Sequence, residues 1–157
     1  MKFNTRILLA QKIILAMGLF VFLGLIVIPV MASDRFVNNG DGTVTDTKTG
    51  LMWSAKDNGI HINWTNASSY CQSYSGGDHK DWRMPTLAEL KTLYEPVIQN
   101  DRGYHITSSV GTTAESCWAS ETRGNEAARF NFTYGQEYWL RQSHSGAGRV
   151  LPVRSGN

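Results

Sequence analysis

The sequence is poor in the residue patterns that build metal centres and catalytic sites. It has four histidines among 157 residues, and none of their spacings matches that of a zinc site. They stand in polar, loop-like stretches, at His61, His79, His105 and His144. No Gly-x-Ser-x-Gly nucleophile elbow occurs. These absences predict no metal, no cofactor and no catalytic residues, although a Ser/His/Asp triad drawn from distant positions stays open.

The turn-rich stretch from 38 to 53 lacks the acids that a calcium loop requires. Calcium takes about six to eight oxygen ligands, usually from several carboxylates that end in a bidentate acid. Here Asp41 and Asp46 are the only acids, and no Glu closes the run. Asn39-Gly40-Asp41-Gly42, between two short apolar runs, is instead typical of a tight hairpin. We therefore expect a turn at this point and no calcium site.

The sequence also lacks the basic excess of a nucleic-acid-binding protein. Its formal charge of +2 includes Lys2, Arg6 and Lys12, which are the only charged residues before position 34. Without them, 12 Lys and Arg stand against 13 Asp and Glu, so no nucleic-acid partner is expected. The charge is unevenly spread, because all six basic residues after position 101 are arginines: Arg102, Arg123, Arg129, Arg141, Arg149 and Arg154.

The first 32 residues have the pattern of a secretory signal. A basic start is followed by an uncharged apolar run from Ile13 to Val30, and Val30-Met31-Ala32 puts small residues at the peptidase positions. This predicts cleavage after Ala32. The run is also nearly long enough to span a bilayer, so a retained anchor is the alternative. Either outcome predicts a periplasmic or cell-surface location, with membrane contact only through this segment, and one domain over 33–157.

Only two cysteines, Cys71 and Cys117, are present. An even number of cysteines in an exported chain favours a disulfide, because the compartment is oxidising. Two buried free thiols are the alternative, and the residues alone leave both open.

Strand and helix signals alternate along residues 33–157. Phe36-Val37, Thr43-Val44-Thr45 and Leu51-Met52-Trp53 predict a small meander. Asn63 can cap a helix that ends at Gly76-Gly77 and whose apolar face holds Trp64, Ala67, Tyr70, Cys71 and Tyr74. Further strand-like runs lie at 117–120, 129–134, 138–142 and 149–154.

The segment from Asp81 to Leu90 contains the clearest helix start. Thr86 and Glu89 form a capping box, in which the hydroxyl and the carboxylate each bind a backbone N–H. Asp81 and Arg83 stand on either side of Trp82 and predict an ion pair that orients the turn, in preference to an active site. We therefore expect a structural role for Asp81, Trp82, Arg83, Thr86 and Glu89.

The runs 129–134 and 138–141 contain the candidate binding site. Aromatic residues at 130, 132 and 134 share one strand face, and a three-residue loop at 135–137 would add Tyr138 and Leu140 to it. The opposite face would then present Arg129, Asn131, Thr133, Trp139 and Arg141. Guanidinium groups bind carboxylate or sulfate in bidentate fashion, so these residues predict a site for an acidic polysaccharide. The alternative is an ordinary solvated strand face with Trp139 packed under a loop.

Several segments share their order and spacing with one known family. DGTVTDTKTGLMW, GGDHKDWRMPTLAEL, CWASE, ARFNFTYG and RVLPVR resemble the bacterial family named for the C-terminal domain of a Legionella collagen-like adhesin. The resemblance covers nearly all of 36–154. It implies an α+β, C-type-lectin-like fold, with two short helices and twisted antiparallel sheets. It also implies a surface or envelope location.

The resemblance also bears on function. For some adhesins of this family, the resemblance implies a trimeric domain that binds polyanionic sugars. A homo-oligomer is therefore one expectation. No catalytic residues come with the motif. Many members have a second cysteine in the last strand, where this chain has Pro152, which leaves Cys117 as the only partner for Cys71. The leading interpretation is a non-catalytic module that binds an acidic glycan or a surface protein. A structural subunit of an envelope assembly and an envelope enzyme with divergent chemistry are the alternatives.

Overall fold

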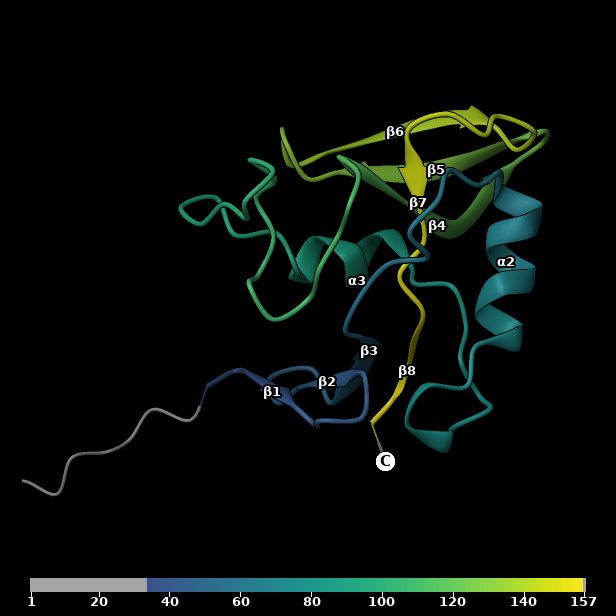
Figure 1. Ribbon diagram of the computed structural model, residues 1–157. Coiled ribbons are helices and arrows are strands. Elements are labelled where there is room, and N and C mark those ends of the chain that lie inside the picture. Colours follow the sequence, from purple (N-terminus) through teal and green to yellow (C-terminus); the bar gives the residue numbers. More distant parts are fainter. Residues whose placement is uncertain (1–33, 157) are drawn as a thin grey trace, which may run out of the picture. The chain divides into compact units, whose positions relative to one another are not determined.

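The computed structural model describes residues 34–156, which form two four-stranded sheets and two α-helices (Figure 1). The predicted α+β class with two helices is confirmed. The sheets are antiparallel except for one parallel pair of strands. No helix within this range is long and apolar enough to cross a bilayer. The predicted cleavage after Ala32 lies outside the described residues.

The first sheet is a meander closed by the last strand of the chain. Its strands are β1 (Phe36–Asn38), β2 (Thr43–Asp46), β3 (Leu51–Ser54) and β8 (Val153–Ser155). They follow the order β1-β2-β3-β8, and all neighbours are antiparallel. The predicted meander is confirmed, and β8 adds a fourth strand from the far end of the sequence.

Two carboxylates shape the turns of this sheet. Asp41 accepts hydrogen bonds from the backbone N–H and the hydroxyl of Thr43, at 3.0 and 2.6 Å. Buried Asp46 accepts from the guanidinium of Arg35, at 2.8 and 2.7 Å, and from the backbone N–H of Lys48. Gly40 adopts a φ of +80°, as a tight turn requires. The turn prediction is confirmed, and residues 34–156 contain no group of three or more side chains suited to a metal ion.

The second sheet has the order β6-β5-β4-β7. Its strands are β4 (Ser116–Arg123), β5 (Glu126–Asn131), β6 (Gln136–Arg141) and β7 (Gly148–Arg149). β7 runs parallel to β4, and an irregularity in β4 follows Trp118. The single strand expected over 149–154 is in fact two, because the chain leaves the second sheet after β7 and enters the first at β8.

The first helix, α2 (Trp64–Ser73), is capped as predicted. The Asn63 side chain accepts a hydrogen bond from the Asn66 N–H at 2.9 Å, and Ala67 and Cys71 are buried. The helix ends before Tyr74, and the 3-10 helix η1 (Gly76–Asp78) follows. The Trp64 indole donates to the carbonyl of Ala119 at 2.8 Å, which fixes α2 against β4.

The second helix, α3 (Leu87–Thr92), has the predicted capping box. Thr86 accepts from the Glu89 N–H at 3.1 Å, and the Glu89 carboxylate accepts from the Thr86 N–H at 2.8 Å. The predicted Asp81–Arg83 ion pair is wrong. Arg83 binds Glu89 at 2.6 Å, whereas Asp81 binds Arg154 of β8 at 2.7 Å, because the segment before α3 pairs with β8.

Trp82, the third residue of that motif, is a core residue. Its ring is buried, and its indole donates to the carbonyl of Gly76 at 3.1 Å. The ring also meets Tyr74 edge to face, with 5.0 Å between the ring centres. The structural role expected of this motif is therefore supported through contacts other than the predicted ion pair.

Two hydrophobic clusters cover opposite faces of the second sheet. The larger one joins β4 and β5, through Cys117 and Phe130, to the first sheet and to α3. The smaller one joins the other face, through Trp118 and Ala127, to Cys71 of α2. Both faces are therefore covered over β5 and the first half of β4, whereas β6 at the sheet edge keeps exposed residues. The predicted binding residues of β5 are buried for this reason.

The two cysteines belong to different clusters and are not bridged, so of the two alternatives left open by the sequence, the structure has the buried free thiols. Cys71 lies in the smaller cluster and Cys117 in the larger one, and both are free thiols. Burial raises the pKa of each thiol to about 12. They therefore behave as small apolar residues of the core.

Candidate functional site

The predicted hairpin is present, but its register differs from the prediction. Four residues, 132–135, connect β5 to β6, and Arg129 pairs with Tyr138. Asn131 fixes this turn, because its side-chain oxygen accepts from the N–H groups of Thr133 and Tyr134 at 2.8 and 3.1 Å. The pairing differs from the predicted one by an odd number of residues, which moves every β6 side chain to the other face. The predicted shared face of Arg129, Trp139 and Arg141 is therefore wrong.

Arg129 and Asn131 are buried, so their predicted role on an exposed face is also wrong. Only 1% of Arg129 is exposed, and its guanidinium lies 3.8 Å from the centre of the Trp118 ring. Asn131 is occupied by the turn. The physical reason is that this face packs against the smaller cluster and is covered by the chain that follows β6.

The other three predicted residues have different environments. Thr133 lies within the turn and is partly buried. Trp139 packs against the larger cluster, and the Arg123 guanidinium covers its ring at 4.4 Å from the ring centre. The ring is therefore a packing element, as the alternative interpretation held. Arg141 alone keeps an exposed charged side chain.

Arg141 lies at the edge of a hollow of about 540 Å³ where β6 ends. We call it the Arg141 hollow, and its walls are Leu140, Arg141, Ser143, His144, Ser145 and Gly146. Within residues 34–156, no hydrogen bond or ion pair engages the side chains of Arg141, Ser143, His144 or Ser145. The hollow thus presents a guanidinium, two hydroxyls and an imidazole that are all available to a ligand.

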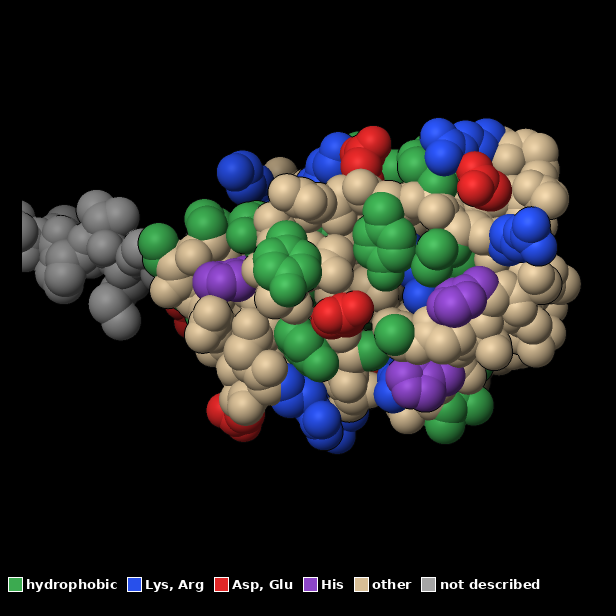
Figure 2. Space-filling model, turned by 90° about the horizontal axis from the view of Figure 1, so that it is seen from above, with side chains coloured by type: hydrophobic (Ala, Val, Ile, Leu, Met, Phe, Trp, Pro, Cys, Tyr) green, Lys and Arg blue, Asp and Glu red, His purple; other side chains and the backbone are tan. Residues whose placement is uncertain are grey.

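The charge of Arg141 is not neutralised by its cross-strand neighbour. Glu126 pairs with Arg141 in the sheet, but its carboxylate is bound by Arg123 at 2.8 Å. Figure 2 shows Lys and Arg side chains spread around the margins of this face, with two His side chains in its right half. A desolvated oxyanion on Arg141 would gain two parallel hydrogen bonds from the guanidinium fork.

Three other hollows contain cations, and most of these are already paired. One, of about 370 Å³ beside Trp64, contains Arg83, which Glu89 holds at 2.6 and 2.9 Å. The second, of about 350 Å³, contains Arg35, which Asp46 holds, and Lys91, which lies 2.5 Å from Glu137. It also contains Lys48, for which no ion pair is described among residues 34–156 but whose ammonium lacks the planar fork of a guanidinium. The third, of about 230 Å³, is lined by the same Arg35. An anion would have to compete with these carboxylates, so the Arg141 hollow is the better anion site.

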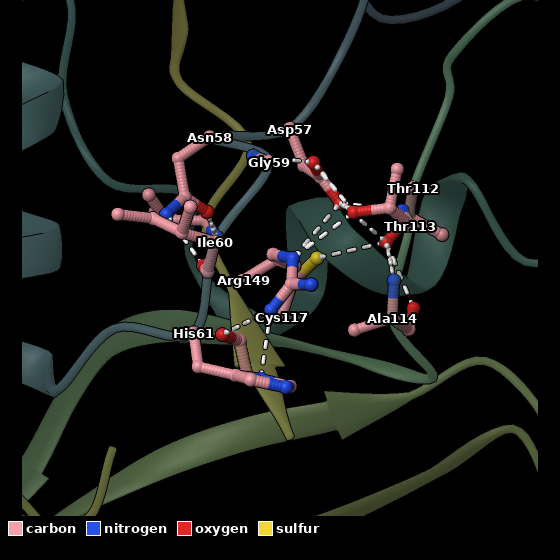
Figure 3. Close-up of polar contacts among 12 residues, drawn as sticks. Asp57, Asn58, Gly59, Ile60, His61, Thr112, Thr113, Ala114, Cys117 and Arg149 are labelled. Carbon is pink, nitrogen blue, oxygen red and sulfur yellow. Dashed lines mark hydrogen bonds and ion pairs between the residues drawn. The ribbon is translucent and has the colours of Figure 1, made fainter. Parts of the chain in front are cut away.

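A separate polar cluster surrounds Asp57 (Figure 3). The buried carboxylate accepts from the Gly59 N–H at 2.8 Å and from the N–H and hydroxyl of Thr113. The Arg149 guanidinium lies 3.8 Å from it and also contacts Nδ1 of His61 at 2.8 Å. Because a guanidinium only donates, Nδ1 of His61 accepts, and the proton of the neutral ring is on Nε2.

This cluster joins three segments of the chain through hydrogen bonds to one buried carboxylate. Both oxygens of Asp57 are occupied by donors, so the carboxylate has no free position from which to take a proton. Sequence reasoning missed the cluster because Thr113 is 56 positions from Asp57 and no motif links them. The one local signal is the Asp57-Asn58-Gly59 turn.

Comparison with known proteins gives one positive result. A search of curated proteins finds no match to this chain. The family profile described as the Lcl C-terminal domain matches residues 42–154, which run from the end of the first turn to β8 and include the Arg141 hollow. This is an adhesin-like bacterial module, and the match extends over most of the sequence. The chain therefore belongs to the Lcl C-terminal domain family, the family that its motifs resemble.

Proposed function

We propose that this protein is a non-catalytic recognition module that binds an acidic glycan in the Arg141 hollow. The observation that carries the proposal is the exposed guanidinium of Arg141, which forms no ion pair with a carboxylate of residues 34–156. A uronic acid or a sulfated sugar supplies the complementary group. Its carboxylate or sulfate would accept both hydrogen bonds of the fork.

The rest of the hollow suits the neutral parts of a saccharide. The hydroxyls of Ser143 and Ser145 and the ring of His144 can donate to and accept from sugar hydroxyls. Leu140 offers an apolar wall for the C–H face of a sugar ring. The volume of about 540 Å³ falls within the usual range of small-molecule sites.

The chemical state of the titratable groups supports a binding role over catalysis. Burial alone would raise the pKa of Asp46 and of Glu89, but hydrogen bonds from Arg35 and Arg83 hold each pKa below its ordinary value. These carboxylates serve structural ion pairs outside the Arg141 hollow. Perturbed groups at a catalytic site would be expected to converge on one cleft.

The proposal extends to location and assembly. The signal-like segment before residue 33 supports export to the periplasm or the cell surface. Two helices with twisted, largely antiparallel sheets support a C-type-lectin-like fold. A homo-oligomer would present several Arg141 hollows to one polymer and raise its avidity.

A panel of sulfated and uronic-acid glycans tests the proposed site. We expect the parent protein to bind and Arg141→Ala to bind about 10- to 100-fold more weakly, because one charge-assisted bidentate contact is lost. Arg141→Lys should also bind more weakly, since an ammonium lacks the planar fork. Affinity should fall as salt increases.

Arg102→Ala is the matched control, because it removes the same charge from an exposed position outside the hollow. Equal losses in Arg102→Ala and Arg141→Ala would indicate a general charge effect, and the assigned site would then be wrong. Absence of binding by the parent to every acidic glycan would reject the function itself.

A further inference from the structure

Arg129 is the least satisfied charged side chain in the described part of the protein. It is 1% exposed, and its Nε and Nη2 groups have no hydrogen-bond partner among residues 34–156. The chain passes directly over it, since a Cβ added at Gly148 would lie 2.3 Å from the guanidinium carbon. Only a glycine permits this close approach.

The surroundings of Arg129 compensate its charge incompletely. The ring of Trp118 stacks on the guanidinium, and one carbonyl accepts from Nη1. Burial lowers the pKa of Arg129, although the nearby Tyr138 hydroxyl opposes this shift. The Tyr138 hydroxyl donates its own proton to Ser116 at 2.8 Å. The Glu115 charge also favours the charged form of Arg129, but no carboxylate among residues 34–156 is hydrogen-bonded to the guanidinium. Because burial of a cation is unfavourable without such a partner, the site can accept one more negatively charged group.

The one hydrogen-bonded carbonyl connects Arg129 to the Arg141 hollow. It belongs to Gly146, lies 2.7 Å from Nη1 of Arg129, and is part of a residue that lines the hollow. The peptide of Gly146 therefore separates the hollow from the buried guanidinium. The next carbonyl, that of Ala147, accepts from the Ser116 hydroxyl at 3.0 Å.

The loop that forms this partition is held by few contacts. Residues 143–147 are exposed, and the two side-chain bonds from Arg129 and Ser116 tie its carbonyls to the sheet. Ala147 adopts a φ of +53°, a left-handed conformation that residues with a side chain seldom adopt. A ligand that replaces the Gly146 carbonyl on Arg129 would release this strained segment.

We propose that Arg129 is a second oxyanion-binding group, which a carboxylate or sulfate in the Arg141 hollow reaches by displacing the Gly146 carbonyl. The anion would accept from Nη1, which the Gly146 carbonyl now occupies, and from Nη2, which is now unpartnered. Arg141 would bind the ligand at the surface, and Arg129 would select for an acidic group. This assignment rests on the proposed function of the hollow.

Thermal unfolding of protein expressed from the full-length sequence provides the test. Sodium sulfate and sodium glucuronate are titrated to about 20 mM, with NaCl keeping the ionic strength constant. We expect a saturable rise in Tm of roughly 5 °C with a midpoint on the order of 1 mM, because two charge-assisted hydrogen bonds are gained. Sulfate that acts only by exclusion from the surface gives a linear rise without saturation.

Matched variants decide where the anion binds. Arg129→Met keeps a long side chain without donors and should abolish the saturable rise, whereas Arg102→Met should retain it. A saturable rise that persists in Arg129→Met, or its absence from the parent, would overturn the inference. Comparison of the two salts shows whether sulfate, carboxylate or both are accepted.

A second measurement covers the case in which Arg129→Met does not fold. In the parent protein, the NMR signal of the Arg129 Nε–H should shift during the titration with the same midpoint as the Tm. A signal that does not move would overturn the inference. The glycan panel tests the proposed function separately from these two measurements. Arg141→Ala can lose glycan binding even if no anion binds Arg129. An anion can also bind Arg129 even if the protein binds no glycan.

Discussion

The six arginines after position 101 divide into two groups of three by burial. Arg129, Arg149 and Arg154 are buried, and each has a specific role in the interior or in an ion pair. The exposed members are Arg102, Arg123 and Arg141. Arg123 is already paired with Glu126. On the surface, the basic excess of residues 102–157 therefore consists of separate arginines and not of a continuous basic patch.

The capping box gives the sharpest prediction for single residues. Thr86→Ala should reduce the free energy of unfolding by about 0.5–2 kcal/mol, because the Glu89 N–H loses its acceptor. The loss in the double variant Thr86→Ala/Glu89→Ala should be smaller than the sum of the single losses, since both residues belong to one box. Urea unfolding measures all three.

Thr65→Ala is the matched control for this series, because Thr65 is an exposed helical threonine whose side chain makes no described hydrogen bond. It should change stability by less than about 0.5 kcal/mol. Strictly additive losses at Thr86 and Glu89 would contradict the reciprocal box.

At the scale of elements, Cys71 and Cys117 lie in the clusters on opposite faces of the second sheet. Native protein should therefore be inert to a thiol reagent at pH 8, because both thiols are buried and have a pKa of about 12. After unfolding in guanidinium without reductant, two thiols per chain should react, which is the total cysteine content. Unfolded protein that reacts only after reduction would instead show the disulfide that the structure lacks.

Local signals predicted the elements better than their pairing. The capping box and the Asn63 cap are formed by residues close in sequence, so the sequence alone located both helix starts. The β5–β6 pairing depends on turn length, and Asn131 extends the turn to four residues through its side chain. A shift of the β5–β6 pairing by an odd number of residues was enough to exchange the two faces of β6.

The candidate site was predicted only in part for the same reason. Arg141 is exposed, as the prediction for its strand face required, because it is the last residue of β6. Its role in binding stays a prediction. The burial of Arg129 depends on segments remote in sequence. These are α2 and the chain at Gly148, which passes over the Arg129 guanidinium. No periodicity within 129–134 could reveal what covers that strand.

For the whole molecule, the predicted export can be tested directly. Mass spectrometry of protein recovered from the periplasm or medium should find Ser33 as the first residue, because small residues flank the expected cleavage position. Recovery of the intact chain in the membrane fraction would show a retained anchor instead. Recovery of the intact chain in the cytoplasm would reject export.

The position of β8 has a consequence for the order in which the protein can fold. Val153 pairs with Trp53 in β3 and also exchanges backbone hydrogen bonds with Arg83, so three segments distant in sequence meet at β8. The first sheet cannot be completed before residues 153–155 have left the ribosome. Contacts of such long sequence separation also form slowly. Under the proposed export, this delay would keep the preceding residues unfolded, and so able to pass through a translocation pore, until β8 has been synthesised.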